Sequence, residues 1–209
     1  MSAATPVGGS RTYAYIGPET RFSFATWTKA VRSGRTFVSN GPLLSFALSG
    51  CQIGDEISLP KGGGWLEAIA KVQSVWPVNT LELIVNGKVE HMVRSEVGEN
   101  ILSLRHKLNL KKSSWVAVRC SSDLVKHHMM MGRGNLGAHT SPIYVVVGED
   151  RMFNASDAEY MLTLIEGTMA YLDTVSTRLD EKRHSQMNGL LHAAYHELTD
   201  RLNAGKSGL

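Results

Sequence analysis

The stretch LELIVNGKVEHMV, residues 81–93, constrains the fold more than any other part of the sequence. Leu81, Leu83 and Val85 alternate along a run of β-forming residues, so they would point to one face of a strand. Asn86-Gly87 follows, and this pair tolerates the positive φ angles of a two-residue hairpin turn. The residues after the turn predict the returning strand. The stretch therefore predicts a β-hairpin.

Extended structure is predicted on both sides of this hairpin. Runs rich in β-branched, aromatic and alternating apolar residues are separated by turns containing Gly, Pro or Asn. The runs are Arg11–Ile16, Thr36–Ser39, Leu43–Leu48, Leu66–Trp76, Ile101–Leu108, Trp115–Cys120 and Ile143–Val147. The helices that parallel crossovers require are missing among them. The fold expected is therefore mainly β, an antiparallel β-sandwich.

Helices are predicted on either side of the sandwich. Ser23 is a suitable N-cap for a short N-terminal helix over Phe24–Ser33, which Gly34 would end. Near the C-terminus, Ser156 and Glu159 fit a capping box, and apolar residues then recur at helical spacing in two segments. These segments predict an αα-hairpin. The domains expected are a linker at 1–22, the β-sandwich at 23–152 and the helical hairpin at 153–209.

Charge and composition exclude several classes of partner. The chain has 209 residues and a formal net charge of +3, with Lys and Arg scattered among carboxylates. A nucleic-acid-binding domain gathers positive charge on one face, so no nucleic acid is expected as a partner. No apolar stretch is long enough to cross a bilayer, so no membrane insertion is expected. Cys51 and Cys120 lack metal-type spacing, and buried free thiols are favoured over a disulfide. The sequence does not indicate in which cellular compartment the protein works.

The segment around His127 and His128 resembles a site most closely, since Asp123 and His139 lie near it in sequence. Adjacent histidines point in different directions on a strand or a helix, so they would share one metal only in an irregular loop. A solvated loop is the simpler interpretation. We therefore predict no metal site and no catalytic residue in this chain. An enzyme with its metal held by these histidines is the alternative.

The residues His139-Thr140-Ser141-Pro142 stand just before a predicted strand. His139 would either contact a bound group or, with Thr140, satisfy buried backbone groups where the strand begins. A nucleophilic pair of Ser141 and His139 would need a third group and an oxyanion hole, and the chain has no Gly-x-Ser-x-Gly motif. The structural role is favoured.

Two arginines also need partners, because Arg35 and Arg119 stand in or beside otherwise apolar strands. A carboxylate such as Asp55 or Glu82 would make a structural ion pair. Convergence with Asn40 would instead make an anion-binding pocket. The sequence leaves both arrangements open.

Several segments, taken in order, resemble one known family. SGRTFVSNGPLL, residues 33–44, is similar to a stretch of the CehA/McbA family of metallohydrolases, which carry a catalytic domain of the PHP (polymerase and histidinol phosphatase) type. The similarity continues in Gly50–Asp55, Leu81–Gly87, Ser114–Arg119 and Ala138–Val145. Ordered matches that extend over nearly the whole chain are more specific than any single match.

The resemblance implies a region that follows a catalytic domain. PHP-type domains hold divalent metals with clustered histidines and acidic residues, including His-x-His pairs, and hydrolyse esters, carbamates or phosphoesters. This chain has no His-x-His motif, so the metals would belong to a catalytic domain upstream of residue 1 or supplied in trans. Residues 1–22 would then be a remnant of that domain or a linker from it. The function implied is that of a non-catalytic accessory domain, which packs on the catalytic barrel and shapes its substrate entrance.

On this interpretation four residues face the barrel or its substrate. They are Arg35, Asn40, Arg119 and His139. The alternative function is a stand-alone β-sandwich that binds carbohydrate or a cell-surface polymer, with Trp65, Trp76 and Trp115 as candidate contacts. The apolar residues of the helical hairpin are also compatible with a homo-oligomer.

Overall fold

The computed structural model describes residues 8–124, 135–149, 152–175 and 180–207. The chain divides into two compact units, Met1–Met152 and Phe153–Leu209, and each unit is described by itself. The first unit is mainly β with one short helix, and the second consists of two helices.

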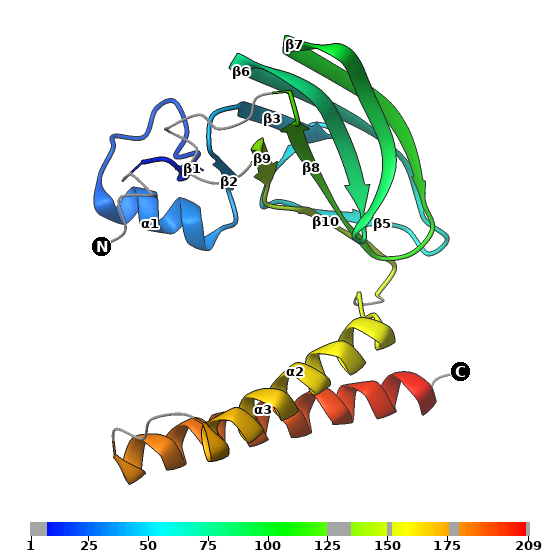
Figure 1. Ribbon diagram of the computed structural model, residues 1–209. Coiled ribbons are helices and arrows are strands. Elements are labelled where there is room, and N and C mark those ends of the chain that lie inside the picture. Colours follow the sequence, from blue (N-terminus) through cyan, green and yellow to red (C-terminus); the bar gives the residue numbers. More distant parts are fainter. Residues whose placement is uncertain (1–7, 125–134, 150–151, 176–179, 208–209) are drawn as a thin grey trace. The chain divides into compact units, whose positions relative to one another are not determined.

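The described residues of the first unit form one continuous ten-stranded sheet. Its strands are β1 Arg11–Ala14, β2 Thr36–Ser39, β3 Leu43–Leu48, β4 Cys51–Gln52, β5 Glu56–Leu59, β6 Gly64–Val85, β7 Lys88–Leu110, β8 Ser114–Ser122, β9 Leu136–Thr140 and β10 Ile143–Val147. The main path is β1-β2-β9-β8-β6-β3-β4, with β7 beside β6 and with β10 between β8 and β5. The sheet curls into an open half-barrel (Figure 1). The mainly β fold is confirmed, but the two separate sheets of a sandwich are not.

Two long strands carry the curl. β6 pairs with β7 along most of its length, while its first half also pairs with β3 and its second half with β8. The buried residues of the first half are even-numbered, from Leu66 to Val72, whereas Leu81 and Leu83 are buried in the second half. Register shifts lie between Gln73 and Thr80, and they move the buried positions from even-numbered to odd-numbered residues. An extra residue in a strand turns every later side chain to the other face of the sheet.

The predicted hairpin at residues 81–93 is confirmed. Asn86 and Gly87 have φ angles of 49° and 80°, as a two-residue primed turn requires. The Asn86 side chain also reaches the next strand. Its Nδ2 donates to Ser114 Oγ at 3.1 Å, and its Oδ1 accepts from the Trp115 N–H at 3.0 Å. Asn86 therefore takes part in the turn and also links the turn to β8.

The inner face of the curled sheet carries a single apolar core. It gathers side chains from β3, β6, β7, β8, β9 and β10. Leu48, Leu81, Leu83, Leu136 and Ile143 are completely buried in it. Because side chains alternate along a strand, the residues between these core positions lie on the outer face.

One strand pair departs from the antiparallel arrangement. β10 runs parallel to β5, while its other edge is antiparallel to β8. β9 and β10 follow one another along the same edge of β8, with Ser141 and Pro142 between them. This arrangement places Tyr144 of β10 opposite Trp115 of β8.

The short helix α1, Phe24–Arg32, precedes β2 and lies beside β1 (Figure 1). Ser23 is its N-cap, as predicted. Ser23 Oγ accepts from the Thr26 N–H at 3.1 Å, and Thr26 Oγ1 accepts from the Ser23 N–H at 2.9 Å. Gly34, with a φ of 67°, follows the helix.

The second unit is a helical hairpin of α2, Ala155–Thr174, and α3, Glu181–Ser207, and the prediction of C-terminal helices is confirmed (Figure 1). The predicted capping box at Ser156 and Glu159 is wrong. The N-cap is Asn154, whose Oδ1 accepts from the Ser156 N–H at 3.1 Å. Asn and Ser cap helices equally well, so the residue that comes first and has an extended backbone begins the helix.

Candidate functional site

A row of cross-strand neighbours crosses the outer face of the first unit. Glu82 on β6 lies opposite Arg119 on β8. His139 on β9 lies between Arg119 and Val38 of β2. We call these four residues the Arg119 row. Opposed residues on neighbouring strands have Cβ atoms about 5 Å apart, so Arg119 and His139 are direct neighbours.

Arg119 is held by an ion pair within this row. Its Nε donates to Glu82 Oε2. The Glu82 side chain is only 14% exposed, whereas the Arg119 side chain is 53% exposed. The guanidinium therefore neutralises a mostly covered carboxylate and keeps its terminal nitrogens for another acceptor. This ion pair is one of the two arrangements that the sequence left open.

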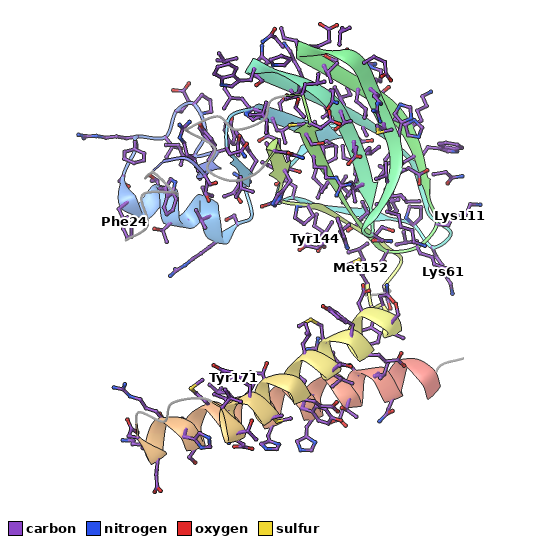
Figure 2. All side chains as sticks on the ribbon, in the orientation of Figure 1. Phe24, Lys61, Lys111, Tyr144, Met152 and Tyr171 are labelled. Atoms are coloured by element: carbon purple, nitrogen blue, oxygen red, sulfur yellow. The ribbon has the colours of Figure 1, made fainter. Side chains whose placement is uncertain are left out.

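Two hollows flank the row, and Arg119 and His139 line both of them. The smaller hollow, of about 330 Å³, also reaches Asn40. The larger, of about 520 Å³, is mainly apolar, and its further lining includes Ile84, Trp115, Pro142, Tyr144 and Met152. Tyr144 and Met152 lie close together at one end of the first unit (Figure 2). A group bound in either hollow would lie beside Arg119 and His139.

Asn40 lines the smaller hollow, but its amide is used inside the protein. Its Nδ2 donates to Asn135 O at 2.9 Å, and its Oδ1 accepts from the Gly137 N–H at 2.8 Å. The Asn40 N–H also donates to Gly137 O, at 3.1 Å. Asn40 therefore holds the end of β2 against the start of β9 and shapes the hollow.

Arg35 lies apart from the other three candidates. It pairs with Asp55, with 3.5 Å between Nη2 and Oδ1. It lines a separate hollow of about 230 Å³ together with Tyr15 and Lys29. The structure thus gathers Asn40, Arg119 and His139 around one hollow and leaves Arg35 at another.

The residues after His139 have structural partners. Thr140 is buried, and its Oγ1 accepts from the Val118 N–H at 3.1 Å. Ser141 Oγ lies 2.8 Å from Thr36 Oγ1. The His139 side chain is exposed, with its Nδ1 3.5 Å from Thr140 O. Thr140 therefore supports the β8 backbone, whereas the His139 ring stays open to solvent beside Arg119.

The predicted histidine segment falls largely outside the described residues, since these do not include His127 and His128. Asp123 accepts a hydrogen bond from Asn79 Nδ2. Among the described residues, no group of three or more His, Cys, Asp or Glu side chains is placed to hold a metal ion.

Both cysteines are free, and Cys120 lies on β8 directly after Arg119. Burial raises the pKa of the Cys120 thiol to about 12. The thiol is therefore protonated at neutral pH and is a poor nucleophile. Cys51 is only half-buried.

The apolar wall of the larger hollow was not predicted as a site. Among single residues, the sequence indicated only Trp115 as a candidate contact, for sugar, whereas Ile84, Pro142 and Tyr144 stood only within longer segments. Alternation along β10 places Tyr144 on the outer face, and this was the available local signal. Its position opposite Trp115 follows from the β8–β10 register, which joins segments far apart in the sequence.

The sequence matches no protein-family model, and a search of curated proteins also gives no match. Among solved structures, a lytic polysaccharide monooxygenase from Jonesia denitrificans aligns with 44% of this chain at 14% identity and a TM-score of 0.27. The chain spans 58% of the length of that enzyme. The CARDB domain of a Pyrococcus furiosus protein aligns over 51% of this chain and 96% of its own length, at 13% identity and a TM-score of 0.31. Similarity at this level supports no inference about fold or function.

No helix in the described part of the chain combines the length and the apolar character that crossing a bilayer requires.

Proposed function

We propose that this chain is a non-catalytic accessory domain of a PHP-type metal-dependent hydrolase. The Arg119 row and its two hollows would be the surface that meets the catalytic domain and borders its substrate entrance. Divalent metals and the hydrolysis of ester, carbamate or phosphoester bonds would belong to that catalytic domain. The observation that carries the proposal is the way in which the family-like segments come together in the fold.

The segments that resemble the CehA/McbA family are far apart in the sequence but lie on neighbouring strands. β2 pairs with β9, β9 pairs with β8, and β8 pairs with the second half of β6 and with β10. Gly50–Asp55 joins the group because the Gly54 N–H donates to Pro142 O at 3.0 Å. The family-like segments therefore contain all four residues of the Arg119 row and lie next to one another in the sheet. Such clustering is expected of a surface that these proteins would use in common.

The chemistry of this surface suits contact with another protein domain. The Arg119 guanidinium has donors left for a carboxylate or a backbone carbonyl. Trp115 and Tyr144 supply aromatic surface in the adjoining hollow. Arg, Trp and Tyr are the residue types that contribute most binding energy at the centres of protein interfaces.

The proposal is tested by titrating the purified chain with the catalytic domain of a CehA/McbA-type hydrolase in a calorimeter. Arg119→Ala is the test variant, and Arg105→Ala is its matched control. Arg105 also pairs with a glutamate of β6, Glu67 at 3.3 Å, but in the other half of the sheet. We expect Arg119→Ala to weaken binding by about tenfold, or about 1.4 kcal/mol, and Arg105→Ala to leave it unchanged.

Hydrolysis gives a second readout in the same mixture. If the domain borders the substrate entrance, its addition should change KM for ester, carbamate or phosphoester substrates more than it changes kcat. The absence of binding, or equal losses in the Arg119 and Arg105 variants, would overturn the proposal. Circular dichroism of both variants separates a loss of binding from a loss of folding.

Carbohydrate binding is the second candidate, and two exposed tryptophans favour it. Trp65 on β6 is 68% exposed, and Trp76 is 38% exposed. An indole on an open sheet face offers an apolar ring for stacking against a sugar. Binding to a glycan array that is lost in Trp65→Ala and retained in Arg119→Ala would favour this function over the accessory role.

A further inference from the structure

The helical hairpin of the second unit is held together by a regular seam. On α2 the seam residues are Ala158, Leu162, Ile165, Met169 and Leu172, which are buried or half-buried. On α3 they are His184, Asn188, Leu191, Tyr195, Leu198 and Leu202. Both sets alternate steps of four and three residues, which is the spacing of a coiled coil.

Polar contacts fix the register of this seam. The Tyr195 hydroxyl donates to Glu166 Oε1 at 2.9 Å. Asn188 Nδ2 donates to Asp173 Oδ1 at 3.2 Å. Both bonds join α2 to α3, so the two helices have a defined antiparallel alignment.

A second apolar stripe runs along each helix and is exposed. On α2 it comprises Met161, Leu164, Tyr171 and Val175, which are 46–69% exposed, with Thr168 completing the spacing. On α3 it comprises Met187 and Leu190, which are 49% and 72% exposed, followed by Ala194. The steps are again three and four residues, so each stripe has the geometry that packs against another helix.

The two stripes lie on the same side of the hairpin. Met161 and Leu164 each precede a seam residue of α2, and Met187 and Leu190 each precede a seam residue of α3. Each residue of a right-handed helix is rotated by about 100° from the next. In an antiparallel pair, the residues just before the seam positions therefore project to the same flank. The exposed stripes form one surface, which we call the 161–194 face.

We propose that the 161–194 face binds the same face of a second copy of this chain, forming a four-helix bundle. Six of its side chains are 46–72% exposed. Covering them would bury roughly 600 Å² on each copy, or about 1,200 Å² in total, which reaches the lower range of stable protein interfaces. An apolar patch of this size is at the upper end of what monomeric proteins expose, and such patches often mark interaction sites.

A second copy supplies the kind of surface that the face requires. The stripe from Met161 to Val175 is about 21 Å long at 1.5 Å per residue. Among the described residues, the other helix is α1, whose nine residues reach only about 13 Å. A second hairpin offers two long helices with the same spacing, and a two-fold axis brings identical apolar stripes together.

The proposal is tested by sedimentation equilibrium of the full chain at micromolar concentration. The expected result is a dimer whose dissociation constant rises at least tenfold in Leu190→Glu. His192→Glu is the matched control, because His192 is exposed on the same helix but follows a seam residue and so lies on the opposite flank. The control should remain dimeric.

Leu190 is 72% exposed within one copy, so its replacement leaves the hairpin itself intact, and the helical circular dichroism should be unchanged. A monomeric wild-type chain would overturn the proposal and would leave the face to the first unit of the same chain or to a different protein. A dimer that weakens equally, or not at all, in the two variants would also overturn it.

Discussion

Replacement of Asn86 tests how the hairpin at residues 81–93 stabilises the first unit. Asn86 has a φ of 49°, and its amide bonds to Ser114 and Trp115 of β8. Asn86→Gly accepts this backbone conformation and removes both hydrogen bonds. Asn86→Ala removes the same bonds and adds left-handed strain, because alanine carries a Cβ without a polar side chain. The two variants therefore separate the side-chain contribution from the backbone contribution.

The expected magnitudes follow from these contacts. Two lost hydrogen bonds of about 1 kcal/mol each should lower the free energy of unfolding by about 2 kcal/mol in Asn86→Gly. Glycine adopts the left-handed φ without strain, which stabilises the folded state, but it also has more conformational freedom in the unfolded chain. These two effects on the free energy of unfolding roughly offset each other. Asn86→Ala should lose about 3 kcal/mol in all, since left-handed backbone costs a non-glycine residue about 1 kcal/mol more.

Tryptophan fluorescence during urea unfolding is the assay. All four tryptophans lie in the first unit, so their signal reports on this unit and not on the helical hairpin. The slope of the unfolding free energy against urea concentration should be the same in all variants. The urea concentrations at the unfolding midpoints can then be compared directly as measures of stability. An Asn86→Gly variant as stable as the wild type would refute the role assigned to the amide. Equal stabilities of the Gly and Ala variants would refute the left-handed turn.

Three further predictions concern the close packing at Gly54 and the buried thiol of Cys120. Gly54→Ala should destabilise the first unit by about 3 kcal/mol in urea unfolding, since its Cβ would lie 2.2 Å from Ser33 O at a φ of 86°. Gly50→Ala, whose Cβ meets no atom within 4 Å, should lose only the backbone cost of about 1–2 kcal/mol, and equal losses would contradict the contact. At about pH 8, a thiol reagent should modify Cys51 much faster than Cys120, because burial raises the pKa of the Cys120 thiol to about 12. Above the ordinary pKa of a thiol, the unfolded chain loses the Cys120 proton, whereas the folded chain keeps it until the pH approaches about 12. Stability should therefore fall with rising pH by about 1.4 kcal/mol per unit more in the wild type than in Cys120→Ala, and parallel profiles would argue against the shift.

Local signals in the sequence predicted local structure well. Asn86-Gly87 fixed the hairpin because few dipeptides accept two consecutive positive φ angles. Ser23 began α1 because its hydroxyl reaches a free amide of the first turn. The start of α2 was misjudged because Asn154 and Ser156 are both good caps, and the sequence gives no ranking between them.

The curled sheet could not be predicted from such signals. The predicted strands stopped at Trp76 and resumed at Leu81, whereas β6 continues through this region. Pro77 and Gly98 face each other at the bend: a Cβ on Gly98 would lie 2.8 Å from Pro77 Cβ and 2.7 Å from Leu124 Cδ1. Proline and glycine mark irregular positions, but they do not distinguish a bulge within a strand from its end.

The candidate site depended even more on pairings between distant segments. Arg119 and His139 become neighbours through the β8–β9 register, and Glu82 reaches Arg119 through the β6–β8 register. Residue type alone predicted that each arginine needs a partner, and the partners Asp55 and Glu82 are those that were considered. The separation of Arg35 from the other candidates required the fold.

Hydroxyl-radical footprinting of the chain with and without a PHP-type catalytic domain tests the central claim most directly. His139 in the Arg119 row and Tyr144 in the adjoining hollow are exposed, while Trp65 is 68% exposed in the other half of the sheet and serves as an internal control. The accessory-domain proposal predicts that the catalytic domain protects Tyr144 and His139 from oxidation and leaves Trp65 unchanged. Protection of Trp65 with Tyr144 and His139 still fully oxidised would contradict it.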